Sequence, residues 1–331
     1  MDRFQWLPED IVEEIVSRVP YIFHNELRYV CKMWKTIIES GKIYKERISS
    51  GSSDKLVCFL DQSDDCNRIA VYDPVHNSVA KSPSVPSKFQ FTRFSHCLCV
   101  DQKLIVLGLQ YENQPTGTTM VFDFMSCRWK TGAEIPIDKF GYQLACCASP
   151  ERLVYIAGRS KKAAVYDVGE DKWELLPEMP HSISWARGYY IDGMFHVVTI
   201  FGTLNYLSNR CNPVAKQWEV LQRFELLRYP PLSFVADSGH IYSFGEYNVM
   251  EFDCLRKMWM EAGNPPSHLN WLGSTESHNN IFQFVTGKAD GSPKFGLWSN
   301  TSSNFSWRWV IRDRSRTTTW SYYNSLTIVE I

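Results

Sequence analysis

The sequence lacks several features that would place it in common functional classes. It has no excess of charge of either sign, because 35 Lys and Arg oppose 36 Asp and Glu, which gives a formal net charge of -1. This balance argues against a nucleic-acid-binding protein that relies on a broad basic surface, and against a polybasic protein that binds membrane surfaces. No apolar run approaches the roughly 18 residues of a membrane-spanning helix, so none is predicted.

The first residues also lack the features of a secretory signal. Residues 1–10 have neither a basic start followed by an apolar run nor a small-residue cleavage site. The ten cysteines form no Cys-x-x-Cys pair, and several lie inside apolar runs. We therefore expect free, mostly buried thiols in a reducing compartment, and we expect the protein in the cytoplasm, the nucleus or both.

Residues 9–48 carry a helical pattern. Ile11, Ile15 and Val19 recur at the spacing of one helix face, and Pro20 ends this first helix. A second helical pattern runs from residue 27 to residue 38 and stops at Gly41, and a short third helix is expected over 43–48. We predict a helical domain over residues 1–48 and a flexible Ser-rich linker over 49–54. A core of about 40 residues is small, so this domain should pack on a partner or on the rest of the chain.

The remaining residues, 55–331, read as short strands separated by turns. One family of strands, three of four ending on glycine, spans 104–108, 153–158, 195–198 and 241–245. A second family, mostly aromatic residue then Asp, spans 71–73, 121–123, 165–167, 210–212 and 251–253. A single Trp follows most members of the second family, at Trp129, Trp173, Trp218 and Trp259. We assign these residues to packing between repeats, because Trp and Tyr bury large areas.

The spacing of these repeats predicts the architecture. A period of roughly 40 to 50 residues with four short strands is typical of a propeller blade. Residues 55–331 have room for about six such units, the sixth being irregular around Trp271, Trp298 and Trp307. The first unit begins at its second strand, so we expect residues 325–331 to supply the missing strand and close the ring, which hides the sheet edges. The predicted fold is a small all-α domain followed by an all-β six-bladed propeller.

These motifs together resemble a known combination of domains. The start Leu7-Pro8-Glu9-Asp10, the end Arg18-Val19-Pro20 and the segment from Val30 to Trp34 resemble an F-box. The glycine-ended strand, the Tyr-Asp strand and the Trp resemble kelch repeats. Residues 165–180 are similar to the third blade of a plant F-box/kelch subgroup that targets phenylpropanoid enzymes and cytokinin-response regulators. The chain departs from the family pattern at His24-Asn25, where a Leu-Leu pair is usual, and at Val79, where a Trp is expected.

The resemblance implies a non-catalytic substrate-recognition subunit of an SCF ubiquitin ligase, with no cofactor. The F-box would dock on a Skp-type adaptor and, through it, on cullin and RING subunits. The propeller would capture a target protein for ubiquitination and degradation. The adaptor-binding residues that the match implies are Leu7, Pro8, Ile11, Ile15, Val19, Val30, Cys31 and Trp34. The alternative for these side chains is that they pack on one another or on the propeller.

The resemblance also implies where the target binds. In kelch propellers the loops that enter the inner strands and the loops that follow the glycine-ended strands share one rim. Arg beside Tyr or Trp, the combination that dominates interface hot spots, recurs in these loops. We therefore predict a target-binding rim led by Arg93, Trp185, Arg187, Arg228, Tyr229 and Trp271. The alternative is that these are solvated loop residues and aromatic side chains packed between blades.

Two other functions remain open at this point. One is a kelch-type metalloenzyme, but the eight His are scattered and no Glu-x3-Asp-x3-His run exists, since Glu134-x3-Asp138 ends on Tyr142. His196 lies in an apolar strand and is expected in the core rather than on a metal. The other is a non-ligase scaffold whose F-box no longer meets the adaptor, which His24-Asn25 suggests. The target itself is not named by the sequence.

Overall fold

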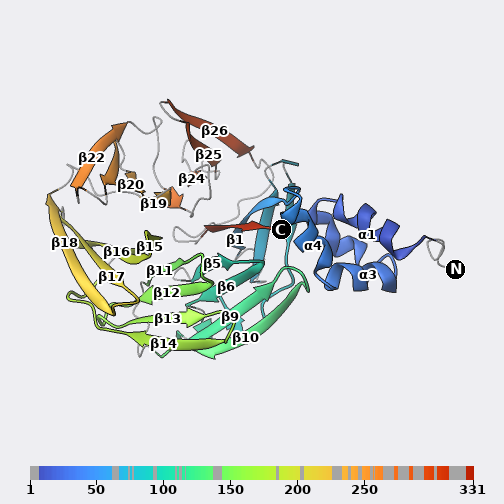
Figure 1. Cartoon of the computed structure of the whole chain (residues 1–331), viewed down its shortest axis with the longest axis horizontal. Helices are drawn as coiled ribbons and strands as arrows, with labels where there is room; N and C mark the ends of the chain where they lie inside the picture. The colour runs from blue at the N-terminus through green and yellow to red at the C-terminus, as the bar shows by residue number, and fades with distance from the viewer. Residues whose placement is uncertain are drawn as a thin grey trace.

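The structure is a computed structural model in which a helical unit adjoins a series of β-sheet blades (Figure 1). It describes residues 7–61, 67–73, 75–76, 78–91, 95–108, 110–111, 114–115, 117–136, 144–183, 186–201, 205–225, 233–237, 240–244, 248–253, 256, 258–263, 272–274, 283–285, 294–301, 304–312 and 326–331.

The helical unit contains four α-helices and one 3-10 turn. They are α1 (Glu9–Ser17), η1 (Tyr21–Phe23), α2 (His24–Leu27), α3 (Lys32–Glu39) and α4 (Lys42–Ser49). Glu9 and Asp10 lie in the first turn of α1, where the helix dipole favours acidic side chains. The single helix predicted over 27–38 was wrong, because Cys31 is extended, with φ -164° and ψ 171°, and separates α2 from α3.

Five four-stranded antiparallel sheets form the described blades. From one edge of the sheet to the other, blade 1 contains β27 (Leu326–Glu330), β1 (Lys55–Asp61), β2 (Arg68–Asp73) and β3 (Ser78–Lys81). In the same direction, blade 2 contains β5 (His96–Val100), β6 (Lys103–Leu107), β9 (Thr118–Asp123) and β10 (Arg128–Glu134), and blade 3 contains β11 (Ala145–Ala148), β12 (Leu153–Ala157), β13 (Ala163–Asp167) and β14 (Lys172–Leu176). Blade 4 contains β15 (Ala186–Ile191), β16 (Met194–Phe201), β17 (Asn205–Asn212) and β18 (Gln217–Glu225), and blade 5 contains β19 (Ser233–Asp237), β20 (His240–Phe244), β21 (Val249–Asp253) and β22 (Met258–Gly263).

Blade 1 combines strands from both ends of the sequence. The late strand β27 pairs with β1, and Leu56 lies opposite Val329. The pairing continues beyond the strands, because the Asp54 N–H donates to the Ile331 carbonyl at 2.7 Å and the Ile331 N–H donates to the Asp54 carbonyl at 3.0 Å. The prediction that the C-terminal segment supplies the missing strand of the first unit is confirmed.

The repeated Trp residues join each blade to the one before it. The Trp129 indole N–H donates to the Pro83 carbonyl of blade 1 at 3.0 Å, and Trp218 donates to the Pro177 carbonyl that follows blade 3 at 2.7 Å. Trp173 donates to Thr119 Oγ1 of blade 2 at 3.1 Å. The interpretation of these Trp residues as packing between repeats is confirmed. Val79 takes the corresponding register position in blade 1, opposite Tyr72.

The prediction of six blades was wrong for the described residues, which show five. The segment expected to form the sixth blade forms two separate two-stranded pairs, β23 (Leu272–Ser274) with β24 (Gln283–Val285) and β25 (Lys294–Thr301) with β26 (Asn304–Arg312). This segment lacks the Tyr-Asp strand that pairs with the Trp strand in the regular units, so the repeat pattern gave no register for a four-stranded sheet there. A small further sheet joins β4 (Phe89–Gln90), β7 (Gln110–Tyr111) and β8 (Gln114–Pro115).

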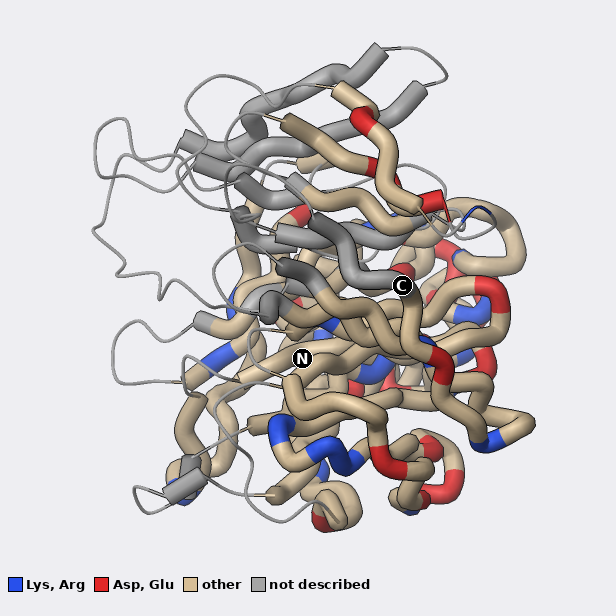
Figure 2. Tube along the Cα trace, turned by 90° about the vertical axis from the view of Figure 1, so that its left-hand side faces the viewer, with Lys and Arg blue, Asp and Glu red and all other residues tan. Residues whose placement is uncertain are grey.

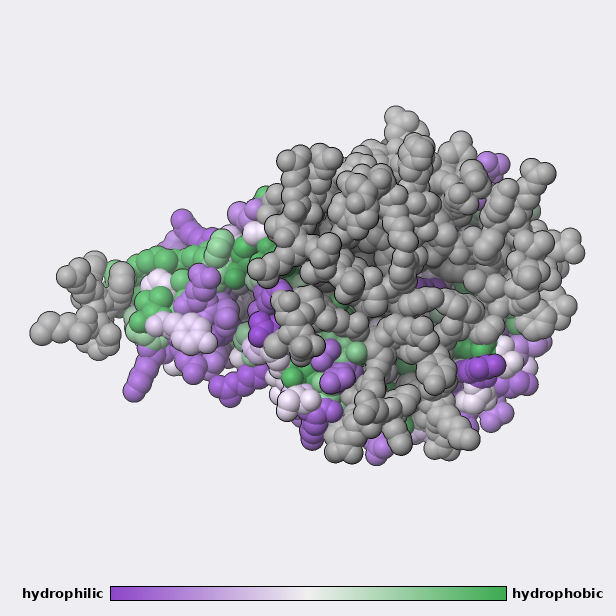
Figure 3. Space-filling model, turned by 180° about the vertical axis from the view of Figure 1, so that it is seen from behind, coloured by the Kyte–Doolittle hydropathy of each residue, from purple (hydrophilic) through white to green (hydrophobic). Residues whose placement is uncertain are grey.

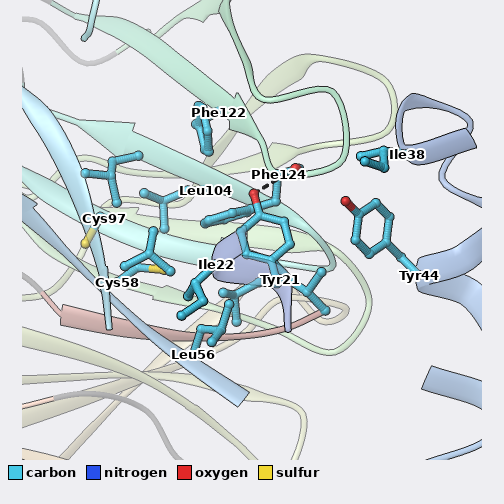
Figure 4. Close-up of a cluster of buried hydrophobic side chains, with 14 of the residues drawn as sticks. Tyr21, Ile22, Ile38, Tyr44, Leu56, Cys58, Cys97, Leu104, Phe122 and Phe124 are labelled. Carbon is cyan, nitrogen blue, oxygen red and sulfur yellow. Dashed lines mark hydrogen bonds between the residues drawn. The ribbon is translucent and has the colours of Figure 1, made fainter. Parts of the chain in front are cut away.

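The largest core cluster joins the helical unit to blades 1 and 2. It contains Tyr21 and Ile22 of η1 together with Leu56, Cys58 and Phe122 of the strands (Figure 4). Three further clusters fill the spaces between blades 2 and 3, 3 and 4, and 4 and 5. The small helical unit therefore completes its core with propeller residues, as its size led us to expect.

The described surface agrees with the balanced composition. Both basic and acidic residues are spread over the described trace (Figure 2). None of the described helices has the length and apolarity needed to cross a membrane. The eight cysteines within the described part of the chain are free thiols, as predicted, but only four of them, Cys58, Cys97, Cys147 and Cys211, are buried, and Cys66 and Cys254 lie outside it.

Candidate functional site

The predicted adaptor-binding residues divide into an exposed and a buried group. Ile11 and Ile15 lie one turn apart on α1, and each side chain is 40% exposed. Val30 is equally exposed, and Pro8 at the start of α1 is exposed as well. On α1, Val12 and Val16 are fully buried. One helix thus presents apolar residues both to the core and to solvent.

The other predicted adaptor residues lie deeper. Trp34 is buried in the core cluster of the helical unit, and Leu7 and Cys31 pack against that cluster while partly exposed. Val19 is half-buried. The structure therefore brings only Pro8, Ile11, Ile15 and Val30 to the open surface, and Trp34 supports the fold instead.

Two exposed aromatic residues were missed by the sequence reasoning. Tyr29, next to Val30, is 84% exposed, and Phe23 of η1 is also exposed. Hydrophobic residues gather on the surface of the helical end of the molecule (Figure 3). Both aromatic side chains fall between the recognised motif segments, and the break after α2 that exposes Tyr29 carries neither Pro nor Gly to reveal it.

His24 and Asn25, which replace the usual Leu pair, have structural roles. His24 is fully buried, its Nε2 lies 2.8 Å from the Val19 carbonyl and its Nδ1 lies 2.9 Å from the Tyr44 hydroxyl. Because a carbonyl only accepts, Nε2 carries the proton and Nδ1 accepts from Tyr44. Burial, aided by the nearby Arg47 and Arg28, lowers the pKa of His24 to about 4. His24 is thus a neutral bridge inside the helical unit.

Of the six predicted rim residues, the structure describes one. Arg187 is half-buried in β15, the inner strand of blade 4. Burial, and next the charge of Arg187, lower the pKa of His96 on β5 to about 3, so Arg187 lies within electrostatic reach of blade 2. The other predicted rim residues lie outside the described residues: Arg93, Trp185, Arg228, Tyr229 and Trp271. The rim therefore stays a prediction.

The buried histidine of blade 4 was also singled out by the sequence. His196 on β16 is buried, and its burial lowers the pKa to about 4, which keeps the ring neutral. Within the described part of the chain, no group of three or more His, Cys, Asp or Glu side chains could hold a metal ion. The predicted place of His196 in the core is confirmed.

Comparison with known proteins places these features in context. Residues 4–46 match the family model of the F-box domain. The chain is 24% identical to the F-box/kelch-repeat protein At1g15670 of Arabidopsis thaliana over 349 residues, which covers 94% of each chain. It is 26% identical to the F-box/kelch-repeat protein At1g80440 of the same plant, covering 81% of this chain and 83% of the relative.

A solved structure matches the fold as well. A chain of the nidogen/laminin complex superposes with a TM-score of 0.57 and covers 83% of this chain and 98% of that chain. At 10% identity this similarity concerns the fold alone.

Proposed function

We propose that this chain, an F-box/kelch-repeat protein similar to those of plants, is the substrate receptor of an SCF-type ubiquitin ligase. In this proposal the helical unit binds a Skp-type adaptor, which links it to cullin and RING subunits, and the propeller holds the target protein. The observation that carries the proposal is the exposed apolar row on α1, Ile11 and Ile15, within an F-box whose opposite side is buried against the propeller.

The proposed adaptor site centres on the apolar side chains of α1 that the rest of the chain leaves exposed, Ile11 and Ile15. Burying a whole Ile side chain yields roughly 1.5 to 3 kcal/mol, so the exposed part of each Ile offers a partner about 1 kcal/mol. Pro8 and Val30 add to the same unit, and Tyr29 adds an aromatic side chain of the kind enriched at hot spots. An apolar helical face of this size fits a hydrophobic groove on a partner.

The proposed receptor performs no bond chemistry of its own. It raises the local concentration of the target's lysines near a charged ubiquitin carrier, and the gain depends on geometry. The target would bind the rim that includes Arg187 and, in the cytosol or nucleus, would be passed on to degradation. By resemblance to the plant subgroup, phenylpropanoid enzymes and cytokinin-response regulators are the first targets to test.

The adaptor interaction can be tested directly with purified proteins. The double variant Ile11→Asp/Ile15→Asp should weaken binding of a Skp-type adaptor about 100-fold, because two charges would have to be buried. The matched control is Val214→Asp, at a highly exposed valine of blade 4. Calorimetric titration of both variants, with circular dichroism to show folding, gives the answer. Equal adaptor affinity for the double variant and the control would overturn the proposal.

A non-ligase scaffold is the alternative that His24-Asn25 suggested. His24 bonds within the helical unit, and Asn25 Oδ1 lies 3.8 Å from Cys127 Sγ of the propeller, so the pair serves the fold rather than the α1 surface. This observation favours the ligase function. A stoichiometric transition metal in the purified protein would instead favour the metalloenzyme.

A further inference from the structure

We infer that the F-box and the propeller form one rigid body, in which the β9–β10 turn of blade 2 is the docking site of the F-box and holds the adaptor surface at a fixed place relative to the rim. The rigid connection follows from contacts between the F-box and the propeller within this chain. Its consequence for ubiquitin transfer rests on the proposed function. The contacts that carry the inference form two anchors, one on the turn of blade 2 and one at the junction with blade 1, and Tyr21 takes part in both. Because the two anchors tie the F-box to different blades, they prevent a rotation that one of them would allow.

The docking turn is a modified copy of a repeated feature. In each described blade the third strand ends on Asp or Asn, whose Oδ1 accepts N–H groups of the turn that follows; these residues are Asp73, Asp123, Asp167, Asn212 and Asp253. In blades 1 and 4 the turn presents a valine, Val75 or Val214, that is 82% or 92% exposed. In blade 2 the same position of the turn carries Met125, which is half-buried, and Phe124 before it is fully buried. The blade 2 turn therefore has a partner, and that partner is the F-box.

The first anchor consists of two hydrogen bonds to backbone carbonyls of this turn. The Tyr21 hydroxyl donates to the Phe124 carbonyl at 2.8 Å, with the two rings in an edge contact at 5.9 Å (Figure 4). The Arg28 guanidinium donates to the Met125 carbonyl at 2.6 Å. Tyr21 and Arg28 are both buried, so the two bonds are shielded from water and hold the turn in one orientation.

A close approach at Gly41 supports this anchor. Gly41 has φ +73°, and a Cβ placed on it would lie 2.7 Å from Met125 Sδ. A side chain at this position would push Met125 away and would also strain the backbone. Glycine therefore permits both the start of α4 and the contact with the turn.

The second anchor lies at the junction between α4 and β1, in the segment predicted to be a flexible linker. Arg47 is buried, and its guanidinium pairs with Asp54 Oδ2 at 2.7 Å and donates to the Val19 carbonyl at 2.9 Å. Asp54 Oδ2 also accepts the Tyr21 N–H at 2.7 Å. Through its backbone pair with Ile331, Asp54 ties this group to the closed edge of blade 1. The junction is thus bonded on both sides.

The topology fixes which side of the propeller the F-box occupies. In blade 2 the β5–β6 turn and the β9–β10 turn lie together, because the Phe124 N–H donates to the Gln102 carbonyl at 3.0 Å. The β5–β6 turn follows the inner strand of blade 2, so the loop that enters this strand lies at its opposite end. The same holds for the inner strand of every antiparallel blade. Arg187, near the start of β15, is therefore at the end away from the F-box. A target on the predicted rim and the adaptor would be held on opposite sides.

A cross-link tests the rigid connection in the whole chain. In the Asn25→Cys variant the introduced thiol faces Cys127 across the interface, so mild oxidation should join the two in a disulfide in nearly all molecules. The matched control is Glu26→Cys, at the neighbouring exposed position of α2, which should give no such product. Mass spectrometry of digested protein identifies the link. Equal yields at the two positions, or no link at position 25, would overturn the inference.

The functional consequence is tested in a reconstituted ligase with the chain itself as ubiquitin acceptor. A fixed geometry should restrict modification to a small set of lysines. Loosening the first anchor with Tyr21→Phe/Arg28→Met should spread modification to further lysines, whereas the cross-linked Asn25→Cys protein should keep the wild-type pattern. Arg256→Met, at an exposed arginine of blade 5, is the control. A wild-type pattern already as broad as that of the loosened variant would overturn the inference. Failure of the adaptor to bind would instead overturn the proposed function and leave the cross-link result standing.

Discussion

The two sides of the F-box differ in what covers them. On the inner side, Val12, Val16 and Tyr44 are fully buried and continue into a core shared with blades 1 and 2. On the outer side, Ile11 and Ile15 of α1 are equally apolar, but each is 40% exposed to solvent. The comparison shows that hydrophobicity alone did not decide which residues the chain buries for itself. The inner side is used for stability, and the outer side is the one that we propose for the adaptor.

The largest effect is expected from a change on the inner side. Phe124→Ala should reduce the free energy of unfolding by about 3 to 5 kcal/mol, because it leaves a cavity under the F-box in the shared core. Urea unfolding monitored by circular dichroism measures this change. Val214→Ala, in the corresponding turn of blade 4, should cost no more than about 0.5 kcal/mol. Similar losses for the two variants would remove the distinction between the two turns.

Acidification should also weaken the inner side. The pKa of His24 is about 4 in the folded chain, below that of an exposed histidine near 6.5, so the unfolded state binds more protons below pH 6.5. The free energy of unfolding should therefore fall as the pH drops from about 6.5 toward 4. At pH 5 the loss due to His24, relative to neutral pH, is roughly 2 kcal/mol.

His24→Leu separates this contribution from those of the other buried histidines. The variant restores the usual family residue and should show a shallower loss of stability between pH 6.5 and 5, although it also gives up the bonds to Val19 and Tyr44. His76→Gln, at an exposed position, serves as the control. Denaturant unfolding at several pH values measures the slopes. If the free energy of unfolding of His24→Leu depended on pH as steeply as that of the wild type, the conclusion that His24 is buried in its neutral form would be wrong.

On the outer side, a single truncation should affect binding and leave stability nearly unchanged. Ile15→Ala should weaken adaptor binding by about 1 kcal/mol, while the free energy of unfolding changes by about 0.5 kcal/mol or less. Calorimetric titration and urea unfolding provide the two numbers. Val16→Ala, the next residue along α1, should show the reverse, with a loss of stability of about 1 to 3 kcal/mol. The comparison of the two sides would fail if both variants lost stability to the same extent.

The smallest effect is expected for an exposed ion pair between blades. Lys216 Nζ lies 2.5 Å from Glu174 Oε1, and both side chains are more than half exposed. Lys216→Met should change stability by no more than about 0.5 kcal/mol, because water screens such a pair. Thermal unfolding at low and high salt checks this value. A loss as large as that of Phe124→Ala would mean that blades are joined by surface charge rather than by the shared core.

The regular blades could be predicted from the sequence because their signals are local and repeated. An aromatic residue before the Asp and a Trp a few residues later place β13 opposite β14, with Tyr166 facing Trp173. The Asp also has a local task, since its Oδ1 holds the turn. Such pairs need no knowledge of the rest of the chain, so the two middle strands of blades 2 to 5 followed from the repeated residues and their spacing.

Other features depend on contacts far apart in sequence and were missed or wrong. The break at Cys31 interrupts an apolar pattern without Pro or Gly, and the sixth unit lacks the repeated residues that give register. The docking turn left one signal that could have been used. Phe124-Met125 is a bulky apolar pair in a turn where blade 3 has Val168-Gly169. The choice between an adaptor surface and an internal contact for Trp34 required the tertiary structure.

The pairing of β27 with β1 has a consequence for synthesis of the protein. During translation β27 leaves the ribosome after every other described strand, yet it supplies the inner edge of the first blade and the backbone partner of Asp54. A polypeptide that stops early leaves β1 with an open edge and leaves Asp54, which belongs to the second anchor, without its backbone partner Ile331. Such fragments would leave the core around Tyr21 and Ile22 incomplete, because Val329 and Ile331 belong to it, and would be more open to chaperones and proteases.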